Sequence, residues 1–222
     1  MEACWMKIVL FQGDSITDAG RTKDDTNMGR GYAALVTAAL GYECPGEYEF
    51  INRGINGNRV TDLYARIKRD IINLRPDVMS ILIGVNDVWH EYDFGGGNGV
   101  DAEKYYRIYS MLIEEVKEAL PDTKIMIMEP FVLKGSATNP NWDVFYTEVR
   151  KRADRAREIA RKYGLAFVSL QAQFEEATKK APEDHWLKDG VHPTLAGHEL
   201  IKGEWLKVFC AICNTEAQMV IM

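Results

Sequence analysis

Five short strand-like runs, four of them mostly apolar, are separated by stretches with helical periodicity, and they constrain the fold of this chain more than any other feature. The runs cover residues 6–11, 47–52, 77–83, 123–128 and 165–170, and a glycine or proline stands close to each. Continuous apolar runs of this length are typical of strands that are buried on both faces. Strands that alternate with helices predict a parallel sheet covered on both sides, and five strands suit the order 2-1-3-4-5. We therefore expect an α/β fold.

Three apolar stripes at helical spacing lie between these runs, over residues 63–74, 105–120 and 142–163. Asp101 is the predicted N-cap of the second stripe, and Gly164 is the predicted C′ residue of the third. The opposite face of the third stripe is charged and carries Arg150, Lys151, Arg155, Arg157, Glu158 and Arg161. A solvated surface is the simplest interpretation of these charges, and a nucleic-acid patch is the alternative.

Length and charge restrict the class of protein. A chain of 222 residues is within the range of one α/β domain, so residues 1–222 are expected to form a single domain. The formal net charge of -6 argues against nucleic acid as the main partner, because phosphate binding needs clustered lysine and arginine. We find no basic segment followed by an apolar core near the start, and no apolar run approaches the roughly 20 residues of a membrane span. These observations predict a cytoplasmic protein with no membrane partner.

The cysteines and one glycine-rich insert each have a structural and a functional interpretation. The cysteines are Cys4, Cys44, Cys210 and Cys213, and the last two have CxxC spacing. A redox or metal site is one interpretation, but no second CxxC or paired histidine accompanies them, so ordinary thiols on a terminal helix are simpler. No cofactor or metal is expected. The insert at residues 95–99 is predicted to be a surface loop, with a lid or rim of a site as the alternative.

Polar residues collect where the predicted strands end. They are Asp14, Ser15, residues 56–59, Asn86, Asp87, Asp189 and His192. Because ligands of open parallel sheets bind beyond the carboxyl ends of the strands, we expect these side chains to gather at one edge.

Ser15, His192 and Asp189 are the components of a nucleophilic triad. A serine hydroxyl is a weak nucleophile until a base takes its proton, and an imidazole titrates near neutral pH. Asp189 precedes His192 by three residues, so it can accept the imidazole proton within one loop. Each residue also has a simpler interpretation, because Ser15 is a natural helix N-cap. Asp189 and His192, with His185 or His198, would alternatively form part of a metal site.

The tetrahedral intermediate of acyl transfer needs hydrogen-bond donors aimed at its oxygen. The N–H groups of Ser15 and Gly57 and the side-chain amide of Asn86 are the candidates. Turn formation is the alternative role for Gly57 and Asn86. Gly54 is a second candidate for the backbone donor, and we favour Gly57.

Four short blocks are spread along most of the chain: GDSITD at 13–18, NRGING at 52–57, GVND at 84–87 and DGVHP at 189–193. In this order they resemble the four blocks of the SGNH (GDSL-type) hydrolases. The resemblance implies a flavodoxin-like, three-layer α/β/α sandwich and a serine esterase. It also implies that Ser15 is the nucleophile, that Asp189 and His192 complete the triad, and that Gly57 and Asn86 complete the oxyanion hole.

A narrower resemblance is carried by GDSITDAGR at 13–21, IGVNDVW at 83–89 and residues 191–198. These segments are similar to intracellular bacterial acetylxylan esterases, which remove acetyl groups from xylo-oligosaccharides. The resemblance implies a small acetylated sugar or oligosaccharide as partner, and self-association into a homo-oligomer. Lys188 departs from the pattern, because those relatives carry an aromatic residue before the triad aspartate, and this leaves the fine substrate preference open.

Aromatic side chains predicted near the site favour a short acyl group on a sugar. Trp89, Tyr92, Phe131 and Trp186 lie on loops expected there, and aromatic rings stack well on sugars. Packing in the core or at the rim is the alternative. We assign Asp14, Trp89 and Trp186 to substrate binding.

Other functions are weighed against this one. Within the same family, the alternative is a general short-chain carboxylesterase or a lysophospholipase or thioesterase. A phospho-acceptor receiver domain has the same fold, but it needs a lysine at the end of the fifth strand, where residues 169–171 read Ser-Leu-Gln. A non-catalytic carbohydrate-binding protein would leave Ser15 and His192 without a role.

Overall fold

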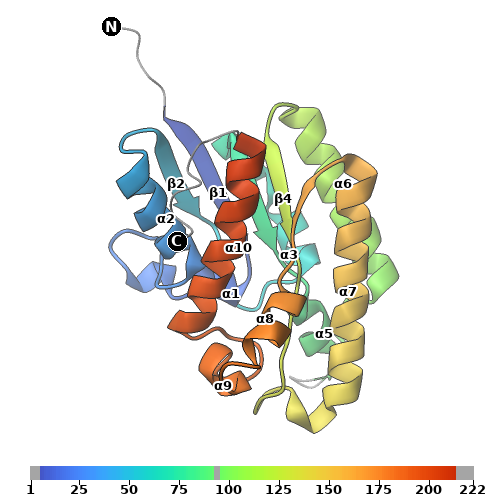
Figure 1. The fold of residues 1–222 in the computed structure, drawn as a ribbon. Coiled ribbons are helices and arrows are strands. Elements are labelled where there is room, and N and C mark those ends of the chain that lie inside the picture. Colours follow the sequence, from blue (N-terminus) through green and yellow to red (C-terminus); the bar gives the residue numbers. More distant parts are fainter. Residues whose placement is uncertain (1–5, 93–95, 214–222) are drawn as a thin grey trace, which may run out of the picture.

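A five-stranded parallel sheet forms the centre of the molecule (Figure 1). The computed structural model describes residues 6–92 and 96–213. The strands are β1 (Lys7–Gly13), β2 (Tyr48–Asn52), β3 (Val78–Leu82), β4 (Lys124–Met128) and β5 (Ala166–Val168). Their order is β2-β1-β3-β4-β5, and every neighbouring pair is parallel. The predicted strands, their order and the α/β class are thus confirmed.

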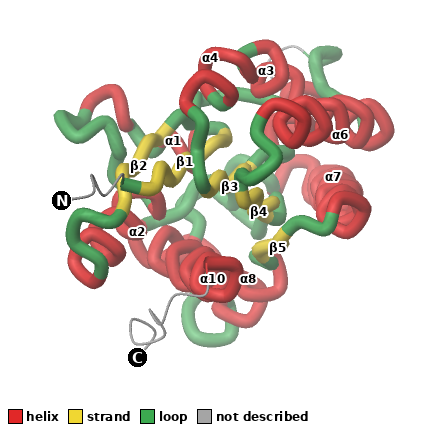
Figure 2. The backbone as a smooth tube through the Cα atoms, turned by 90° about the horizontal axis from the view of Figure 1, so that it is seen from above, coloured by secondary structure: helices red, strands yellow, loops and turns green. Residues whose placement is uncertain are grey.

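Helices cover both faces of the sheet, and two buried cores separate the three layers (Figure 2). One face is covered by α2 (Tyr32–Glu43), α8 (Gln171–Ala177) and α10 (Leu195–Cys213). The other is covered by α3 (Val60–Ala65), α4 (Ile67–Asp70) and α6 (Ala102–Ala119). All five residues of β3 are buried because side chains on both faces meet a helical layer.

The long helix α7 (Trp142–Tyr163) lies beside β5 at the edge of the sheet (Figure 2). Its first half contributes Phe145 and Val149 to one core, and its second half contributes Ala156 and Ile159 to the other. The helix ends at Gly164 as predicted, since this residue is left-handed with a φ of 64°. Placing one helix against both cores explains the unusual length of its apolar stripe.

The predicted cap of α6 is present. The Asp101 carboxylate accepts hydrogen bonds from the N–H groups of Glu103 (3.0 Å) and Lys104 (2.9 Å). By contrast, the stripe at residues 63–74 is not one helix, because it is divided into α3, α4 and a 3₁₀ turn (Ile72–Leu74). The chain leaves helical geometry at Arg66 (φ -112°, ψ 12°), and the apolar stripe continues across the break.

Several short elements were not predicted. They are α5 (Val85–Tyr92), α9 (Glu183–Trp186) and the 3₁₀ turns Arg21–Lys23 and Asn139–Asn141. A helix start was anticipated at Ser15, and the short helix α1 (Ser15–Asp18) is present, with Asp14 rather than Ser15 as its N-cap. The longer helix α2 was also missed, because its sequence is apolar on nearly all sides and has no stripe to detect. Pro193 lies before the last helix, because α10 begins at Leu195, and Pro193 pairs with Leu187 in an isolated bridge.

The charged face of α7 is only partly a solvated surface. Arg150 and Arg157 point to Glu129, at N–O distances of 2.8 and 3.5 Å, and the Glu129 side chain is only 2% exposed. Glu129 also accepts hydrogen bonds from the N–H groups of Leu170 (2.8 Å) and Gln171 (3.1 Å). These two arginines therefore fasten α7 to the ends of β4 and β5, which corrects the sequence-based interpretation for them.

Three of the four cysteines and most of the glycine-rich insert lie within the described residues. Within the described residues, Cys44, Cys210 and Cys213 form no disulfide with one another, whereas Cys4 and Gly95 lie outside these residues. No helix in residues 6–92 or 96–213 combines the length and apolar character needed to cross a membrane.

Candidate active site

The end of β1 delivers Ser15 to the carboxyl edge of the sheet. Gly13 is required there by a close approach, because a Cβ atom at this position would overlap the Leu82 carbonyl on β3 and the side chain of Thr17. Asp14 then caps α1, its Oδ1 accepting a hydrogen bond from the Ile16 N–H (2.9 Å). This local geometry makes Ser15 the first residue of α1.

Ser15, His192 and Asp189 form a continuous hydrogen-bonded chain. The Ser15 Oγ atom is 3.0 Å from His192 Nε2, and His192 Nδ1 is 2.7 Å from Asp189 Oδ2. Asp189 Oδ1 accepts two further hydrogen bonds, from the N–H groups of Val191 (2.9 Å) and His192 (2.7 Å). Partial burial raises the pKa of Asp189, but the hydrogen bonds from His192 and Val191 prevail and lower it to about 2. The carboxylate is therefore charged at neutral pH and able to orient the imidazole.

The loop that carries Asp189 and His192 is held in place by its backbone. Gly190 adopts a φ of 94°, and a Cβ atom there would lie 2.6 Å from both the Leu133 carbonyl and Thr138 Oγ1. The Gly190 carbonyl accepts a hydrogen bond from the Leu133 N–H (2.9 Å), and the Asp189 carbonyl accepts one from the Ala137 N–H (3.0 Å). Only glycine fits this contact, which docks the loop on the segment after β4.

A cavity of about 190 Å³ opens beside this chain of hydrogen bonds. Its lining residues are Ser15, Asn56, Gly57, Asn86, Trp89, His90 and His192. Three of the predicted donors, the Ser15 and Gly57 N–H groups and the Asn86 amide, thus belong to residues around one cavity. His90 was not expected at the site from the sequence, and Asn56 was expected only as one of the polar residues at this edge, without a role. The signal available was their position next to Gly57 and Trp89.

The two candidate glycines of the second block differ in their hydrogen bonds. The Gly54 N–H donates to Asn52 Oδ1 (2.8 Å), so it is already used within the loop. Gly57 has a φ of 77°, lines the cavity, and has only His90 Nε2 near the position of a Cβ atom, at 3.9 Å. Asn86 donates from Nδ2 to the Asn58 carbonyl (3.1 Å), and its second amide hydrogen leaves it a further donor. Gly57 is therefore the better candidate.

Of the three predicted substrate-binding residues, one lines the cavity and two do not. Trp89 lines the cavity, and its ring centroid is 5.8 Å from that of His192. Trp186 is not among the lining residues, and its Nε1 donates to the Ala181 carbonyl (3.2 Å). Asp14 is 1% exposed because it caps α1 from below. Asp14 is too deeply buried to contact a substrate, which corrects that assignment. Trp186 lies outside the lining of this cavity, and its assignment to substrate binding stays a prediction.

The other aromatic residues expected near the site also lie outside the cavity lining. Phe131 is 1% exposed and stacks on Phe174, with ring centroids 4.5 Å apart, so it belongs to the core. Tyr92, at the end of α5, is exposed. Packing in the core or at the surface was the alternative for these two residues, and it is the one that the structure supports.

Two buried carboxyl groups lie beneath the site. Desolvation raises the pKa of Asp14 to about 7, although the Ile16 N–H and His192 oppose the shift. Desolvation also raises the pKa of Asp87 to about 7, against the opposing effect of the Val60 N–H. Asp14 Oδ2 is buried without a hydrogen-bond partner in the described part of the chain. Both carboxyl groups are therefore harder to ionise than an exposed aspartate.

The metal interpretation of the histidines is not supported by their positions. His198 Nδ1 accepts a hydrogen bond from the Tyr32 N–H (3.1 Å), and burial together with the charge of Lys188 lowers the pKa of His198 to about 4. The ring of His185 packs against Trp186, with centroids 4.8 Å apart. Across residues 6–92 and 96–213, no three side chains of histidine, cysteine, aspartate or glutamate gather as metal ligands would.

Comparison with known proteins places this geometry in a family. The family model described as "GDSL-like Lipase/Acylhydrolase family" matches residues 11–200. The chain belongs to this family. The match spans the segments that carry Ser15, Gly57, Asn86, Asp189 and His192.

Individual relatives of this GDSL-family chain cover nearly its whole length. An acetylxylan esterase of Geobacillus stearothermophilus is 34% identical over 211 residues, which is 90% of this chain and 92% of the relative. A crystal structure of Axe2, an acetylxylan esterase of the same organism, has a TM-score of 0.81 and 32% identity, and covers 93% of this chain and 95% of its own. A Parabacteroides merdae protein named as a GDSL-like lipase has a TM-score of 0.84 and 35% identity, with 92% and 97% covered. The fold and family predicted from the sequence are thus confirmed.

Proposed function

We propose that this chain is a serine esterase that removes O-acetyl groups from carbohydrates, with acetylated xylo-oligosaccharides as the favoured substrates. The observation that carries the proposal is the contact of a serine hydroxyl with an imidazole that is held by a charged carboxylate, at 3.0 and 2.7 Å, beside an open cavity. This arrangement matches the geometric requirement for an activated nucleophile. Membership of an acylhydrolase family supports the same class of reaction.

In this mechanism, Ser15 Oγ attacks the acetyl carbonyl while His192 Nε2 takes its proton. Asp189 stabilises the imidazolium that forms, since its carboxylate stays charged. The N–H groups of Ser15 and Gly57 and the Asn86 amide donate to the oxyanion of the tetrahedral intermediate. The bond between the acetyl carbon and the sugar oxygen then breaks. His192 gives its proton to this oxygen, which leaves as a sugar hydroxyl. Water, activated by His192, attacks the acetyl-enzyme in the same way and releases acetate.

The size and lining of the cavity support a short acyl group. A cavity of about 190 Å³ is smaller than the roughly 300–1,000 Å³ that drug-sized ligands occupy. Trp89 offers an aromatic face beside the catalytic imidazole, where a sugar ring has room to stack. The relatives named as acetylxylan esterases support the acetyl group and the xylose backbone as the first substrates to test.

The test is hydrolysis of p-nitrophenyl acetate by the wild type and by Ser15→Ala. The variant is expected to lose the activity while its circular dichroism spectrum is unchanged. Full activity of Ser15→Ala would exclude the mechanism. A substrate panel of acetate, butyrate and octanoate esters and acetylated xylose then tests the specificity. Preference for octanoate, for a lysophospholipid or for a thioester would favour the alternative enzymes of the family over the deacetylase.

A further inference from the structure

A buried guanidinium group lies behind the cavity, at the break between α3 and α4. Arg66 has a side chain that is only 10% exposed. It donates hydrogen bonds from Nε to Asn58 Oδ1 (2.9 Å), from Nη1 to the Arg53 carbonyl (2.9 Å) and from Nη2 to the Gly13 carbonyl (3.3 Å). One side chain thus joins the end of β1 to both ends of the loop that contains Gly57.

The acceptors of Arg66 lie on the backbone segments that carry the proposed oxyanion donors. Gly13 is two residues before Ser15, and Arg53 and Asn58 enclose Gly57 in the sequence. Asn58 also accepts the hydrogen bond from Asn86 Nδ2 through its carbonyl (3.1 Å). Arg66 therefore bonds to residues within two positions of Ser15 and Gly57, and one of them, Asn58, also binds Asn86. Arg66 itself does not line the cavity.

Gly57 is open on the side where a side chain would stand. Among the described residues other than its chain neighbours, the nearest atom to the position of a Cβ is His90 Nε2, at 3.9 Å, so no side chain clamps Gly57 from this side. An oxyanion donor has to be held within about 0.5 Å of its productive position. The loop thus needs a rigid support, and the planar guanidinium with its fixed set of donors supplies one.

We infer that Arg66 is a positioning residue that holds the oxyanion hole in its productive geometry. The inference rests on the proposed esterase function. Asp70 keeps the guanidinium in place, because Arg66 Nη1 donates to Asp70 Oδ2 (3.0 Å) and this carboxylate has a side chain only 6% exposed. Lysine cannot replace the guanidinium group, since a single ammonium group cannot reach the carbonyl groups of Gly13 and Arg53 and the Asn58 side chain together.

A purely structural role for Arg66 is the competing explanation, and the chain contains a matched control. Arg69 also pairs with Asp70, at 2.7 Å, but its side chain is 73% exposed and its hydrogen bonds to described residues both go to that carboxylate. Arg69→Ala therefore removes a partner of the same aspartate without touching the loop. Its kcat is expected to equal that of the wild type.

The experiment compares Arg66→Ala, Arg66→Lys and Arg69→Ala, with p-nitrophenyl acetate as substrate, well below the melting temperature of each variant. Both Arg66 variants are expected to lower kcat by about 100-fold, the effect of losing one oxyanion donor. Their KM is expected to stay within about threefold of the wild type, because ground-state binding is not affected. A wild-type kcat in Arg66→Ala, or equal losses in Arg66→Ala and Arg69→Ala, would overturn the inference.

A double-mutant cycle with Asn58→Ala tests the route of the effect. Asn58→Ala removes the acceptor of Arg66 Nε but keeps the backbone carbonyl that binds Asn86. The kcat of this variant is expected to fall by about tenfold. The double variant is expected to be no slower than Arg66→Ala, because both substitutions interrupt the same contact. If Arg66→Ala does not fold, Asn58→Ala alone decides, and an unchanged kcat rejects the inference. Ser15→Ala is assayed in parallel. Activity that disappears in Ser15→Ala but persists in the Arg66 variants rejects this inference alone, whereas activity that persists in Ser15→Ala rejects the proposed function as well.

Discussion

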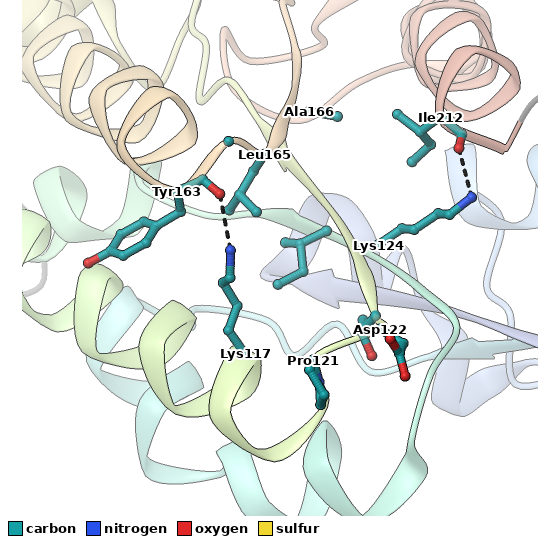
Figure 3. A pocket seen from close by; sticks show the side chains of 11 residues that line it. Lys117, Pro121, Asp122, Lys124, Tyr163, Leu165, Ala166 and Ile212 are labelled. Carbon is teal, nitrogen blue, oxygen red and sulfur yellow. Dashed lines mark hydrogen bonds between the residues drawn. The ribbon is translucent and has the colours of Figure 1, made fainter.

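Two hollows lie at opposite ends of the same sheet, and the candidate active site is the smaller of the two. The cavity at Ser15 opens at the carboxyl ends of the strands and measures about 190 Å³. The other lies at the first residues of β4 and β5, measures about 450 Å³ and is shown in Figure 3. Volume alone would therefore favour the hollow that lacks the candidate triad.

The lysines of the larger hollow already have carbonyl partners. Lys117 Nζ donates to the Tyr163 carbonyl (3.1 Å) at the end of α7, and Lys124 Nζ donates to the Ile212 carbonyl (2.8 Å) near the end of α10 (Figure 3). A cation is favourable at the C-terminus of a helix, so both lysines close helix ends. At the other end of the sheet, the Ser15 hydroxyl and the His192 imidazole contact each other and line the cavity. The difference teaches that polar groups arranged for proton transfer, rather than volume, distinguish a candidate site.

The largest expected effect sharpens this contrast at the carboxyl end. Asp189→Asn keeps the shape of the side chain but removes the charge that selects the His192 tautomer, so kcat should fall by about 10⁴-fold. Steady-state kinetics with p-nitrophenyl acetate measures the loss. A fall of less than about tenfold would mean that Asp189 does not act on His192 in the way proposed.

The second effect concerns the donors around the cavity. Asn86→Ala should lower kcat by about 10²-fold to 10³-fold with little change in KM, because the amide would act only in the transition state. Gly57 and the Ser15 N–H would supply the rest of the oxyanion hole. An equal rise in KM with an unchanged kcat would instead make Asn86 a ground-state binding residue.

The third effect concerns the pH response of the buried carboxyl group next to Ser15. The pKa of Asp14 is raised from 3.8 to about 7, so between these values the folded protein binds a proton that the unfolded chain has lost. The free energy of unfolding should therefore fall as the pH rises from about 4 to about 7, by about 1.4 kcal/mol per pKa unit. The groups that act on Asp14 electrostatically include His192, Asp87, Tyr32 and Tyr105.

Asp14→Asn isolates the contribution of this carboxyl. Asparagine keeps the acceptor for the Ile16 N–H but does not titrate, so the decline of stability with pH should be shallower than in the wild type. Asp87, whose pKa is also raised to about 7, should leave part of the slope. Urea denaturation between about pH 5 and about pH 8 measures both slopes. Identical slopes would show that Asp14 is not the titrating group.

The smallest effect is expected in the larger hollow. Lys117→Met removes the cation at the end of α7, and the free energy of unfolding should fall by less than about 1 kcal/mol. The esterase kcat should not change, because this hollow is separated from Ser15 by the length of the sheet. A large loss of activity in a fully folded Lys117→Met protein would break the comparison.

Local patterns were sufficient to predict much of this protein. Apolar runs and turn residues indicated every strand, and the Asp101 and Gly164 caps depend on neighbours within a few residues. The polar residues at the strand ends predicted that Ser15 and His192 meet, because parallel strands bring their carboxyl ends to one edge. Such features follow from the sequence because their causes, side-chain periodicity and backbone capping, act over short distances.

Only the tertiary structure decided which polar groups face the cavity. Asp14 is next to Ser15 in the chain but lies buried below it, and Trp186 bonds to Ala181 instead of lining the site. Arg66 interrupts a predicted helix and binds acceptors from 4 to 53 positions away. Burial, side-chain direction and long-range hydrogen bonds depend on which segments pack together, and no local pattern carries that information.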